Sequence, residues 1–213
     1  MKFKHELQGG QAYLKGIHFR GEEIGERYLL NNIEFFHGDI VFDCGANLGD
    51  FLLWFQNRKT DISYHAFEPS PEEYKLLKAN IGKHYSKRVA LWNEPTNRDF
   101  YISSQKADSS LIEPRKYTNI LCVNTERLDS FIDEEIKLLK LEAEGCELEV
   151  LEGAGEKINK IKYISADLGP ERGVNQESTF VPVLNFLKKK NFSLIKYNSH
   201  RFTALFKNND FSH

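Results

Sequence analysis

The sequence contains few cysteines and no long apolar run. Its three cysteines, Cys44, Cys122 and Cys146, are odd in number, and their spacing suits neither a zinc site nor a small disulfide framework. Unpaired thiols are typical of a reducing compartment. No stretch approaches the roughly 20 apolar residues that a membrane-spanning helix needs, and the polar first residues lack the apolar core of a signal peptide. We therefore expect a cytoplasmic protein without an integral membrane segment.

The sequence also lacks an excess of positive charge. Its formal net charge is -2, whereas proteins that bind nucleic acid usually carry a basic domain or stripe, because neutralising phosphates dominates their affinity. The one short basic run, residues 188–190, falls where a helix is expected to end, and cations there interact favourably with the helix dipole. The composition therefore predicts no nucleic-acid partner.

The length and pattern of the chain indicate a single domain. A chain of 213 residues is of ordinary size for one domain, and no linker rich in Pro, Gly or Ser divides it. Residues 1–38 are mainly polar and carry an amphipathic pattern between Ile24 and Ile33, which predicts a helix. This segment is a candidate lid over the functional site of the main domain, which we expect at residues 39–213.

Short apolar runs alternate with helical patterns after His37. Expected strands lie at residues 40–42, 62–67, 89–91, 100–102, 121–123, 136–141 and 163–168, followed by a pair at 192–197 and 202–206. Helical patterns separate several of these runs, and the last one extends to about Lys190. The alternation predicts an α/β fold with a mainly parallel sheet, and the last pair predicts an antiparallel hairpin. The pattern resembles the seven-stranded, Rossmann-like fold of class I methyltransferases.

One expected helix has clear start and stop signals. Ser70 is a candidate N-cap, Pro71 suits the first helical position and Glu73 can complete a capping box. Gly82 is suited to end the helix. The sequence therefore predicts a helix that begins directly after the second strand.

The strongest local signal is a glycine-containing turn at residues 43–50, between an expected strand and an expected helix. Gly45 and Gly49 permit a tight turn and a close approach of a ligand. A dinucleotide fingerprint would need further glycines at the positions of Asn47 and Asp50, so that pattern fails. The turn therefore disfavours a nicotinamide oxidoreductase.

The charges of this turn indicate a different nucleoside. Asp43 and Asp50 flank the turn and would repel an anionic pyrophosphate. S-adenosylmethionine has no phosphate and carries a sulfonium and an ammonium, so nearby carboxylates suit it. The turn, with Asp43, Gly45, Asn47 and Gly49 as candidate contacts, therefore predicts S-adenosylmethionine as the cofactor.

A second signal supports a nucleoside site at the end of the next strand. Glu68 stands 23 residues after Gly45, and an acidic residue at about this spacing commonly receives the ribose hydroxyls. A carboxylate can accept both hydroxyls at once. We expect Glu68, the adjoining Pro69 and Ala90 of the third expected strand to contact the cofactor.

Four stretches of the chain together resemble the FkbM family of methyltransferases. They are residues 43–49, residues 67–69, residues 124–129 and the long polar stretch at residues 139–154, which is the most specific. The resemblance covers residues 39 to 167, with Glu142 where the family usually has Asp and Asp167 where a glutamate is more usual. It implies S-adenosylmethionine-dependent O-methylation of sugars or secondary-metabolite hydroxyls.

Three carboxylates cluster after the expected strand at residues 136–141. Because like charges repel, the cluster of Glu142, Glu144 and Glu147 indicates a functional role. Glu147, however, fits best as a structural group at the start of a helix. A sugar hydroxyl is a poor nucleophile, and removing its proton typically contributes 10²–10⁴-fold to the rate. Glu144 is the first candidate base, and Asp167 and His200 are the next.

A metal site is a minority alternative, in which Glu142, Glu144 and Asp167 would supply oxygen ligands to Mg²⁺ or Ca²⁺; we expect no metal. Residues 108–110 are candidates to line the pocket, and Trp92 could stack on adenine, although an ordinary packing role is favoured.

Two alternative functions remain open. A nucleic-acid methyltransferase is disfavoured by the charge and by the absence of an Asn/Asp-Pro-Pro-aromatic motif for a flipped base. A protein that binds S-adenosylmethionine without transferring methyl is disfavoured by the glutamates at residues 142–147. The favoured prediction is an enzyme that methylates a small-molecule or glycan hydroxyl.

Overall fold

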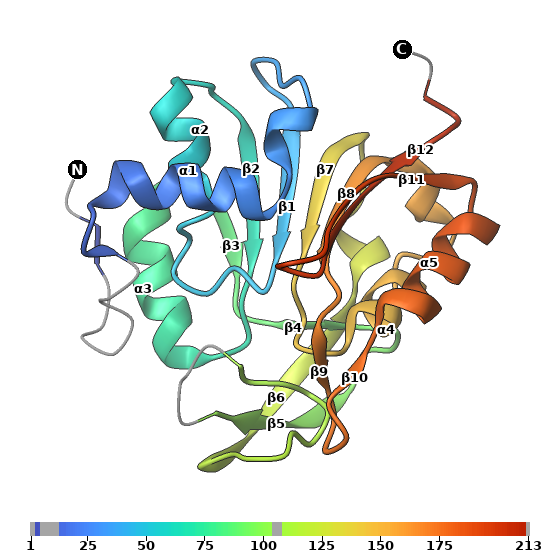
Figure 1. The fold of residues 1–213 in the computed structure, drawn as a ribbon. Helices are drawn as coiled ribbons and strands as arrows, with labels where there is room; N and C mark the ends of the chain where they lie inside the picture. Colours follow the sequence, from blue (N-terminus) through green and yellow to red (C-terminus); the bar gives the residue numbers. More distant parts are fainter. Residues whose placement is uncertain (1–2, 5–12, 104–107, 212–213) are drawn as a thin grey trace.

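A computed structural model describes residues 3–4, 13–103 and 108–211, and its centre is a seven-stranded sheet (Figure 1). The strand order is β11-β12-β8-β7-β1-β2-β3. The five neighbouring strands β8, β7, β1, β2 and β3 pair in parallel, and β12 pairs antiparallel with both β8 and β11. The bounds are β1 Ile40–Cys44, β2 Ser63–Phe67, β3 Tyr85–Lys87, β7 Ile136–Leu141, β8 Ile161–Asp167, β11 Phe192–Asn198 and β12 Thr203–Asn208. The predicted α/β fold with a terminal hairpin is confirmed.

Helices cover both faces of this sheet and bury a core on each (Figure 1). Three helices lie on one side: α1 Ile17–Arg27, α2 Leu52–Arg58 and α3 Pro71–Ile81. Two lie on the other: α4 Glu147–Glu152 and α5 Phe180–Lys189. Every residue of β7 is buried, as expected for a central parallel strand covered on both faces. The sheet therefore holds the ends of β1, β2 and β7 rigidly beside one another.

Smaller elements lie beyond the lower edge of the main sheet in Figure 1. A three-stranded sheet has the order β4-β6-β5, and β9 and β10 form a separate antiparallel pair. Their bounds are β4 Ala90–Trp92, β5 Asn97–Ile102, β6 Asn119–Arg127, β9 Pro170–Arg172 and β10 Glu177–Ser178. Short 3-10 helices complete the described chain: η2 Leu30–Asn32, η3 Leu128–Phe131 and η4 Gly155–Lys160.

The third expected strand forms, but it lies outside the main sheet. The apolar run at residues 89–91 largely coincides with β4, which pairs with β6 in the small sheet. The edge of the main sheet is instead β3, Tyr85–Lys87, whose residues are exposed or only partly buried. An edge strand of polar residues carries little apolar signal, so the buried β4 was more visible in the sequence.

The N-terminal helix is shorter than its amphipathic pattern indicated. Helix α1 ends at Arg27, and Leu29 adopts a left-handed backbone conformation with φ 59°. Tyr28, Leu29 and Ile33 are nevertheless buried. Their apolar spacing therefore reports burial against the sheet rather than one continuous helix.

The start of α3 also differs from the capping box that was expected. Pro71 occupies the first helical turn and Gly82 follows the last residue, as predicted. The Ser70 side chain, however, caps no backbone group; its hydroxyl bonds the Glu73 carboxylate. The Ser70 amide donates instead to Glu68, so Glu68 rather than Glu73 satisfies the backbone at this helix start.

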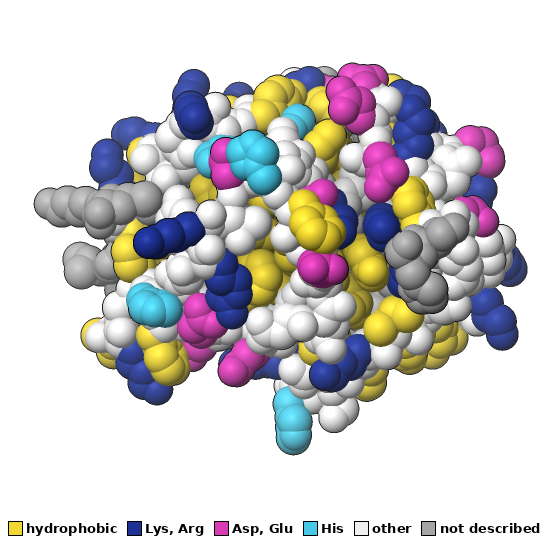
Figure 2. Space-filling model, turned by 90° about the horizontal axis from the view of Figure 1, so that it is seen from above, with side chains coloured by type: hydrophobic (Ala, Val, Ile, Leu, Met, Phe, Trp, Pro, Cys, Tyr) yellow, Lys and Arg dark blue, Asp and Glu magenta, His cyan; other side chains and the backbone are white. Residues whose placement is uncertain are grey.

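No helix within the described residues is long and apolar enough to cross a membrane. On the face shown in Figure 2, Lys and Arg side chains are scattered among acidic and neutral ones, without a continuous basic stripe.

Candidate functional site

A cavity of about 320 Å³ opens where β1, β2 and β7 end. Most of the predicted site residues line it: Asp43, Gly45, Asn47, Glu68, Pro69, Ala90, Glu142 and Glu144. Asp108 and Ser109 line it as well. Gly49, Asp167, His200 and Trp92 lie outside its lining. Most of the sequence candidates therefore gather around one cavity, and Ser110 lies outside its lining together with these four.

The glycines of the turn after β1 are required by packing against the protein. Gly45 and Gly49 have φ angles of 71° and 79°, and Asn47 between them has a φ of 47°. A Cβ on Gly45 would lie 1.9 Å from the backbone oxygen of Glu142, and one on Gly49 would lie 2.6 Å from Ile81. The close approach that these two glycines permit is thus made by the turn after β7, which contacts Gly45, and by α3, which contacts Gly49.

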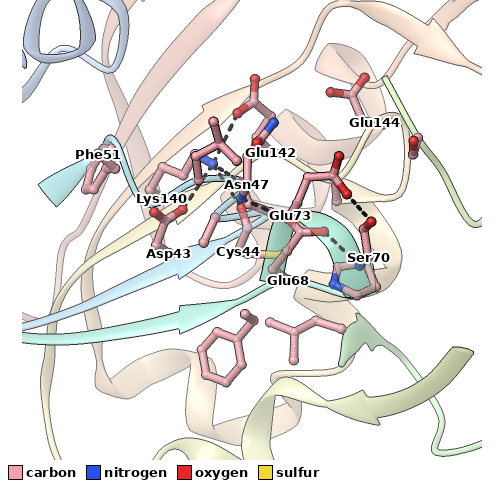
Figure 3. Close-up of a pocket in the computed structure, with 18 of the residues that line it drawn as sticks. Asp43, Cys44, Asn47, Phe51, Glu68, Ser70, Glu73, Lys140, Glu142 and Glu144 are labelled. Atoms are coloured by element: carbon pink, nitrogen blue, oxygen red, sulfur yellow. Dashed lines mark hydrogen bonds and ion pairs between the residues drawn. The ribbon is translucent and has the colours of Figure 1, made fainter. Parts of the chain in front are cut away.

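A buried lysine ties this turn to the end of β7 (Figure 3). The Lys140 Nζ lies 3.0 Å from Asp43 Oδ1 and 3.1 Å from Glu142 Oε2, and it donates to the backbone oxygens of Cys44 and Gly45. Tyr64 donates a second hydrogen bond to Asp43. Burial and these partners leave Asp43 as a structural anchor whose charge Lys140 already balances.

Asp50 is also paired rather than free. Its Oδ2 lies 2.8 Å from Arg20 Nε and accepts a hydrogen bond from the Tyr13 hydroxyl at 3.1 Å. The sequence argument that Asp43 and Asp50 offer free charge to a cation is therefore incomplete, since the structure gives each a counter-charge. The negative charge available to a ligand comes from other carboxylates of the cavity.

Glu68 is held in place by backbone donors at the end of β2. Its two oxygens accept the amide hydrogens of Asn47 at 2.8 Å and Ser70 at 2.9 Å. Burial raises the pKa of Glu68 to about 7, because desolvation outweighs these two hydrogen bonds. Since Glu68 also lines the cavity, its remaining acceptor capacity suits a pair of neighbouring hydroxyls.

The composition of the cavity wall fits a nucleoside. Apolar side chains of Val89, Leu91, Phe100 and Leu111 form part of the lining, which suits a flat, uncharged base. Glu68 contributes a carboxylate to the same lining, which suits ribose hydroxyls. The donor set therefore fits the nucleoside part of S-adenosylmethionine without any phosphate-binding group.

Glu142 is locked as a carboxylate. Arg27 donates to its Oε1 at 2.6 Å and the Tyr28 hydroxyl donates to its Oε2 at 2.5 Å. Burial alone would raise the pKa of Glu142, but Lys140 and Arg27 outweigh it and lower the pKa to about 2. A carboxylate that holds protons so weakly is poorly suited to be the general base.

Asp167 belongs to the same network but lies behind the cavity wall. It is buried, and its Oδ2 accepts a 2.8 Å hydrogen bond from Arg27. Burial raises the pKa of Asp167, and Arg27 opposes the shift. Asp167 thus orients Arg27, which in turn holds Glu142.

Glu144 stands apart from this network (Figure 3). It has a left-handed backbone, φ 49°, and its backbone oxygen accepts a hydrogen bond from Ser110 at 2.7 Å. Burial raises the pKa of Glu144 well above its usual range, and the nearby carboxylates of Glu171, Glu142 and Asp108 add to the shift. Unlike Glu142, Glu144 lines the cavity with a raised proton affinity, which suits a base.

Glu147 has the structural role that the sequence favoured. Its Oε1 accepts the amide hydrogens of Ala143 and Gly145, and its Oε2 accepts the hydroxyl of Thr179. The carboxylate therefore closes the turn before α4.

The metal alternative receives no support from the geometry. No group of three or more His, Cys, Asp or Glu side chains among the described residues is arranged to hold a metal ion. The proposed ligands Glu142 and Asp167 instead share Arg27.

Comparison with known proteins identifies the family. The methyltransferase FkbM domain matches residues 43–194, which is most of the chain and includes the turn, Glu68 and the carboxylates after β7. The chain belongs to the FkbM methyltransferase family. The predicted family and the S-adenosylmethionine cofactor of this methyltransferase are thereby confirmed.

Two curated relatives are similar to this FkbM methyltransferase over different lengths. The 31-O-demethyl-FK506 methyltransferase FkbM of Streptomyces tacrolimicus is 42% identical over 57 residues, which are 27% of this chain and 22% of that protein. The match therefore spans less than a quarter of that relative. Methyltransferase 1 of Beauveria bassiana is 22% identical over 184 residues, with 72% of each chain covered.

Solved structures share the fold at low sequence identity. A TehB-like SAM-dependent methyltransferase from Corynebacterium glutamicum has a TM-score of 0.50 and 10% identity, covering 86% of this chain and 87% of its own. Streptococcus pneumoniae Sp1610, a candidate tRNA (m1A22) methyltransferase in complex with S-adenosyl-L-methionine, has a TM-score of 0.50 and 11% identity, covering 89% and 72%. These similarities confirm the class I methyltransferase fold.

Sequence reasoning missed one carboxylate of the FkbM methyltransferase site. Glu171 lies on β9 and lines the cavity, and burial raises its pKa to about 8. The neighbouring Arg172 anchors β9 through two hydrogen bonds to Glu149 and one to the Gly145 backbone oxygen. An acidic residue shortly after the β8 strand was the available signal, but the expected glutamate was sought at Asp167.

Proposed function

We propose that this FkbM methyltransferase transfers a methyl group from S-adenosylmethionine to a hydroxyl oxygen of a small molecule or glycan. The observation that carries the proposal is Glu144, a half-buried carboxylate with a raised pKa that lines the cavity. A hydroxyl nucleophile needs a proton acceptor, and Glu144 would be that acceptor. The name of the Streptomyces tacrolimicus relative, which specifies oxygen methylation, agrees with this reaction.

The residues divide into a cofactor set and a proton-transfer set. Asp43, Gly45, Asn47, Pro69 and Ala90 would shape the cofactor end, and Glu68 would accept the ribose hydroxyls. Gly49, which does not line the cavity, would support the turn through its close packing against α3. S-adenosylmethionine would supply an electrophilic methyl group. Its sulfur would keep the electron pair of the broken carbon–sulfur bond and leave as a neutral thioether.

The proton-transfer set acts on the acceptor. The hydroxyl oxygen forms the new bond to carbon, and its proton passes to the Glu144 carboxylate. Glu142 would not take this proton, because Lys140 and Arg27 lower its pKa to about 2, and Asp167 lies outside the cavity lining. Their contribution is to position Arg27 and Lys140 along the wall, and positioning of reactants contributes much of the rate in such displacements.

A nucleic-acid acceptor remains the alternative. Sp1610 shares the fold but differs in nearly nine-tenths of the aligned residues, so its substrate does not transfer by similarity. Methyl transfer to purified tRNA and total RNA belongs in the same assay as the hydroxyl acceptors.

The Glu144→Gln variant tests the proposal. S-adenosylhomocysteine release is measured with a panel of oligosaccharides and hydroxylated metabolites, with and without EDTA, and cofactor binding is measured by calorimetry. We expect Glu144→Gln to bind S-adenosylmethionine like the wild type and to lose about 10²-fold or more of turnover. Glu156→Gln, which removes an exposed carboxylate of η4, is the matched control. Wild-type turnover in Glu144→Gln would exclude Glu144 as the base, and methylation of RNA alone would overturn the acceptor class.

A further inference from the structure

The cavity is lined by far more negative than positive groups. Eight carboxylates and three cationic side chains form part of its wall. Each cation is already committed: Arg20 pairs with Asp50, Arg27 with Glu142 and Asp167, and Lys140 with Asp43 and Glu142. None of the three cations is therefore free to balance a further carboxylate.

Among the residues that the structure describes, five of the eight carboxylates have partners and three have none. Glu68 accepts backbone amides, Glu73 bonds Ser70, and Asp43, Asp50 and Glu142 pair with the cations. Within the described part of the chain, the side chains of Asp108, Glu144 and Glu171 form no hydrogen bond and no ion pair. These three residues, which we call the acidic end, come from the loop before Leu111, the turn after β7 and strand β9.

The acidic end is costly in the absence of a cation. Asp108 is exposed, whereas Glu144 and Glu171 are half-buried. A carboxylate shielded from water without a partner resists ionisation, and the raised pKa values of Glu144 and Glu171 are the result. The groups that act on them are mostly acidic: Asp108, Glu142, Glu147 and Asp167, with Arg27 as the opposing cation. The free protein therefore avoids the unfavourable negative charge by keeping Glu144 and Glu171 protonated.

We propose that the acceptor carries a protonated amine close to the hydroxyl that is methylated, as in an amino sugar or amino alcohol. This inference rests on the proposed function, since it concerns the acceptor of the same cavity. An ammonium offers a positive charge and three N–H donors, which match three carboxylates without other partners. Its positive charge would stabilise the ionised forms of Glu144 and Glu171 in place of the protons that they hold. The Glu144 carboxylate would then be ionised and able to accept the hydroxyl proton.

The same charges act against anionic acceptors. A uronic acid or a phosphorylated sugar would place like charges together in a partly buried site, which is unfavourable. The phosphates of a nucleic acid would meet the same repulsion.

Three sugars of one ring size and different charge test the proposal by calorimetry. The protein saturated with S-adenosylhomocysteine is titrated with D-glucosamine, N-acetyl-D-glucosamine and D-glucuronate at a pH where the amine is protonated. S-adenosylhomocysteine lacks the sulfonium charge, so the charge of the sugar is the variable. We expect glucosamine to bind at least about tenfold more tightly than its N-acetyl form, and glucuronate not to bind.

Two variants of the β9–β10 pair provide the control. Glu171→Gln removes a carboxylate of the acidic end, and Glu177→Gln removes an exposed carboxylate of β10 outside the cavity lining. We expect Glu171→Gln to lose most of the preference for glucosamine, and Glu177→Gln to keep it. S-adenosylhomocysteine affinity and melting temperature report whether each variant is folded.

Other outcomes overturn the proposal. Equal binding of glucosamine and its N-acetyl form, a preference for glucuronate, or no binding of any of the three sugars would each do so. A Glu171→Gln variant that loses affinity for S-adenosylmethionine but not for S-adenosylhomocysteine would assign the acidic end to the sulfonium instead. None of these results depends on turnover, so failure of the amine proposal is distinguishable from failure of O-methylation, which the Glu144→Gln assay reports.

Discussion

At the scale of single residues, Glu68 has two roles that its position in the sequence does not separate. It satisfies the amides of Asn47 and Ser70, and so fixes both the turn after β1 and the start of α3. It also presents a carboxylate to the cavity. Loss of the side chain would therefore affect cofactor contacts and the loops that surround them.

Two variants of Glu68 separate these roles. Glu68→Ala removes the ligand contact and leaves two amides without their acceptor, so we expect no measurable binding of S-adenosylmethionine by calorimetry while circular dichroism shows a folded protein. Glu68→Gln keeps an oxygen for one amide but loses the charge, and we expect binding weakened by about 10- to 100-fold. Unchanged affinity in either variant would remove Glu68 from the cofactor site.

At the scale of elements, the turn between β1 and α2 depends on contact with the turn after β7. Gly45 lies so close to the backbone of Glu142 that no side chain fits between the two turns. This contact brings the turn after β1 and the turn after β7 together, and Lys140 stabilises it through hydrogen bonds to the Cys44 and Gly45 backbone oxygens.

Two glycine substitutions measure this contact. Gly45→Ala combines a left-handed backbone with a direct clash, so we expect it to lower the free energy of unfolding by about 3 kcal/mol or more. Gly38→Ala has a similar φ of 86° and open space around its Cβ, so it should cost only about 1–2 kcal/mol. Urea unfolding of both variants gives the comparison, and equal losses would show that backbone strain alone accounts for Gly45.

The elements that the sequence predicted well are those with strong apolar patterns. Strands β1, β7 and β8 and helix α5 are buried on one or both faces, and each appears close to its expected position. Strand β3 was missed because its residues are exposed, and the end of α1 was misplaced because the left-handed Leu29 leaves the apolar spacing intact.

The cavity was predicted in outline because strand ends gather at one edge of a parallel sheet. The partners of each carboxylate could not be predicted in the same way. Lys140 sits in an apolar strand pattern and gives no sign that it binds Asp43 and Glu142, and Glu171 reaches the cavity only because β9 is anchored by Arg172. Such pairings depend on contacts between distant segments, which local patterns do not encode.

At the scale of the whole molecule, the raised carboxyl pKa values affect stability. Burial raises the pKa of Glu171 to about 8, above its value in the unfolded chain. The folded state therefore binds this proton more tightly, and the resulting stability is complete below the unfolded pKa and lost as the pH rises through the folded pKa.

A comparison with Glu171→Gln isolates this effect from the other titrating groups. His65 and His84 have pKa values lowered by burial and act in the opposite direction, but they are common to both proteins. We expect the free energy of unfolding of the wild type, relative to the variant, to fall from about pH 5 to about pH 8 and then level off. Parallel stability curves from urea titrations across this range would contradict the assignment.

The position of β12 has a consequence for synthesis on the ribosome. Strand β8 precedes β12 in the chain, yet β12 lies between β8 and β11 and supplies the antiparallel partner of Ala166 and Asp167. A nascent chain that has emerged as far as α5 thus carries an unpaired β8 edge, the kind of edge that invites association with other chains. The β8 edge that ends at Asp167, a partner of Arg27, is paired only after residues 203–208 have been translated, so this edge is among the last features of this methyltransferase to mature.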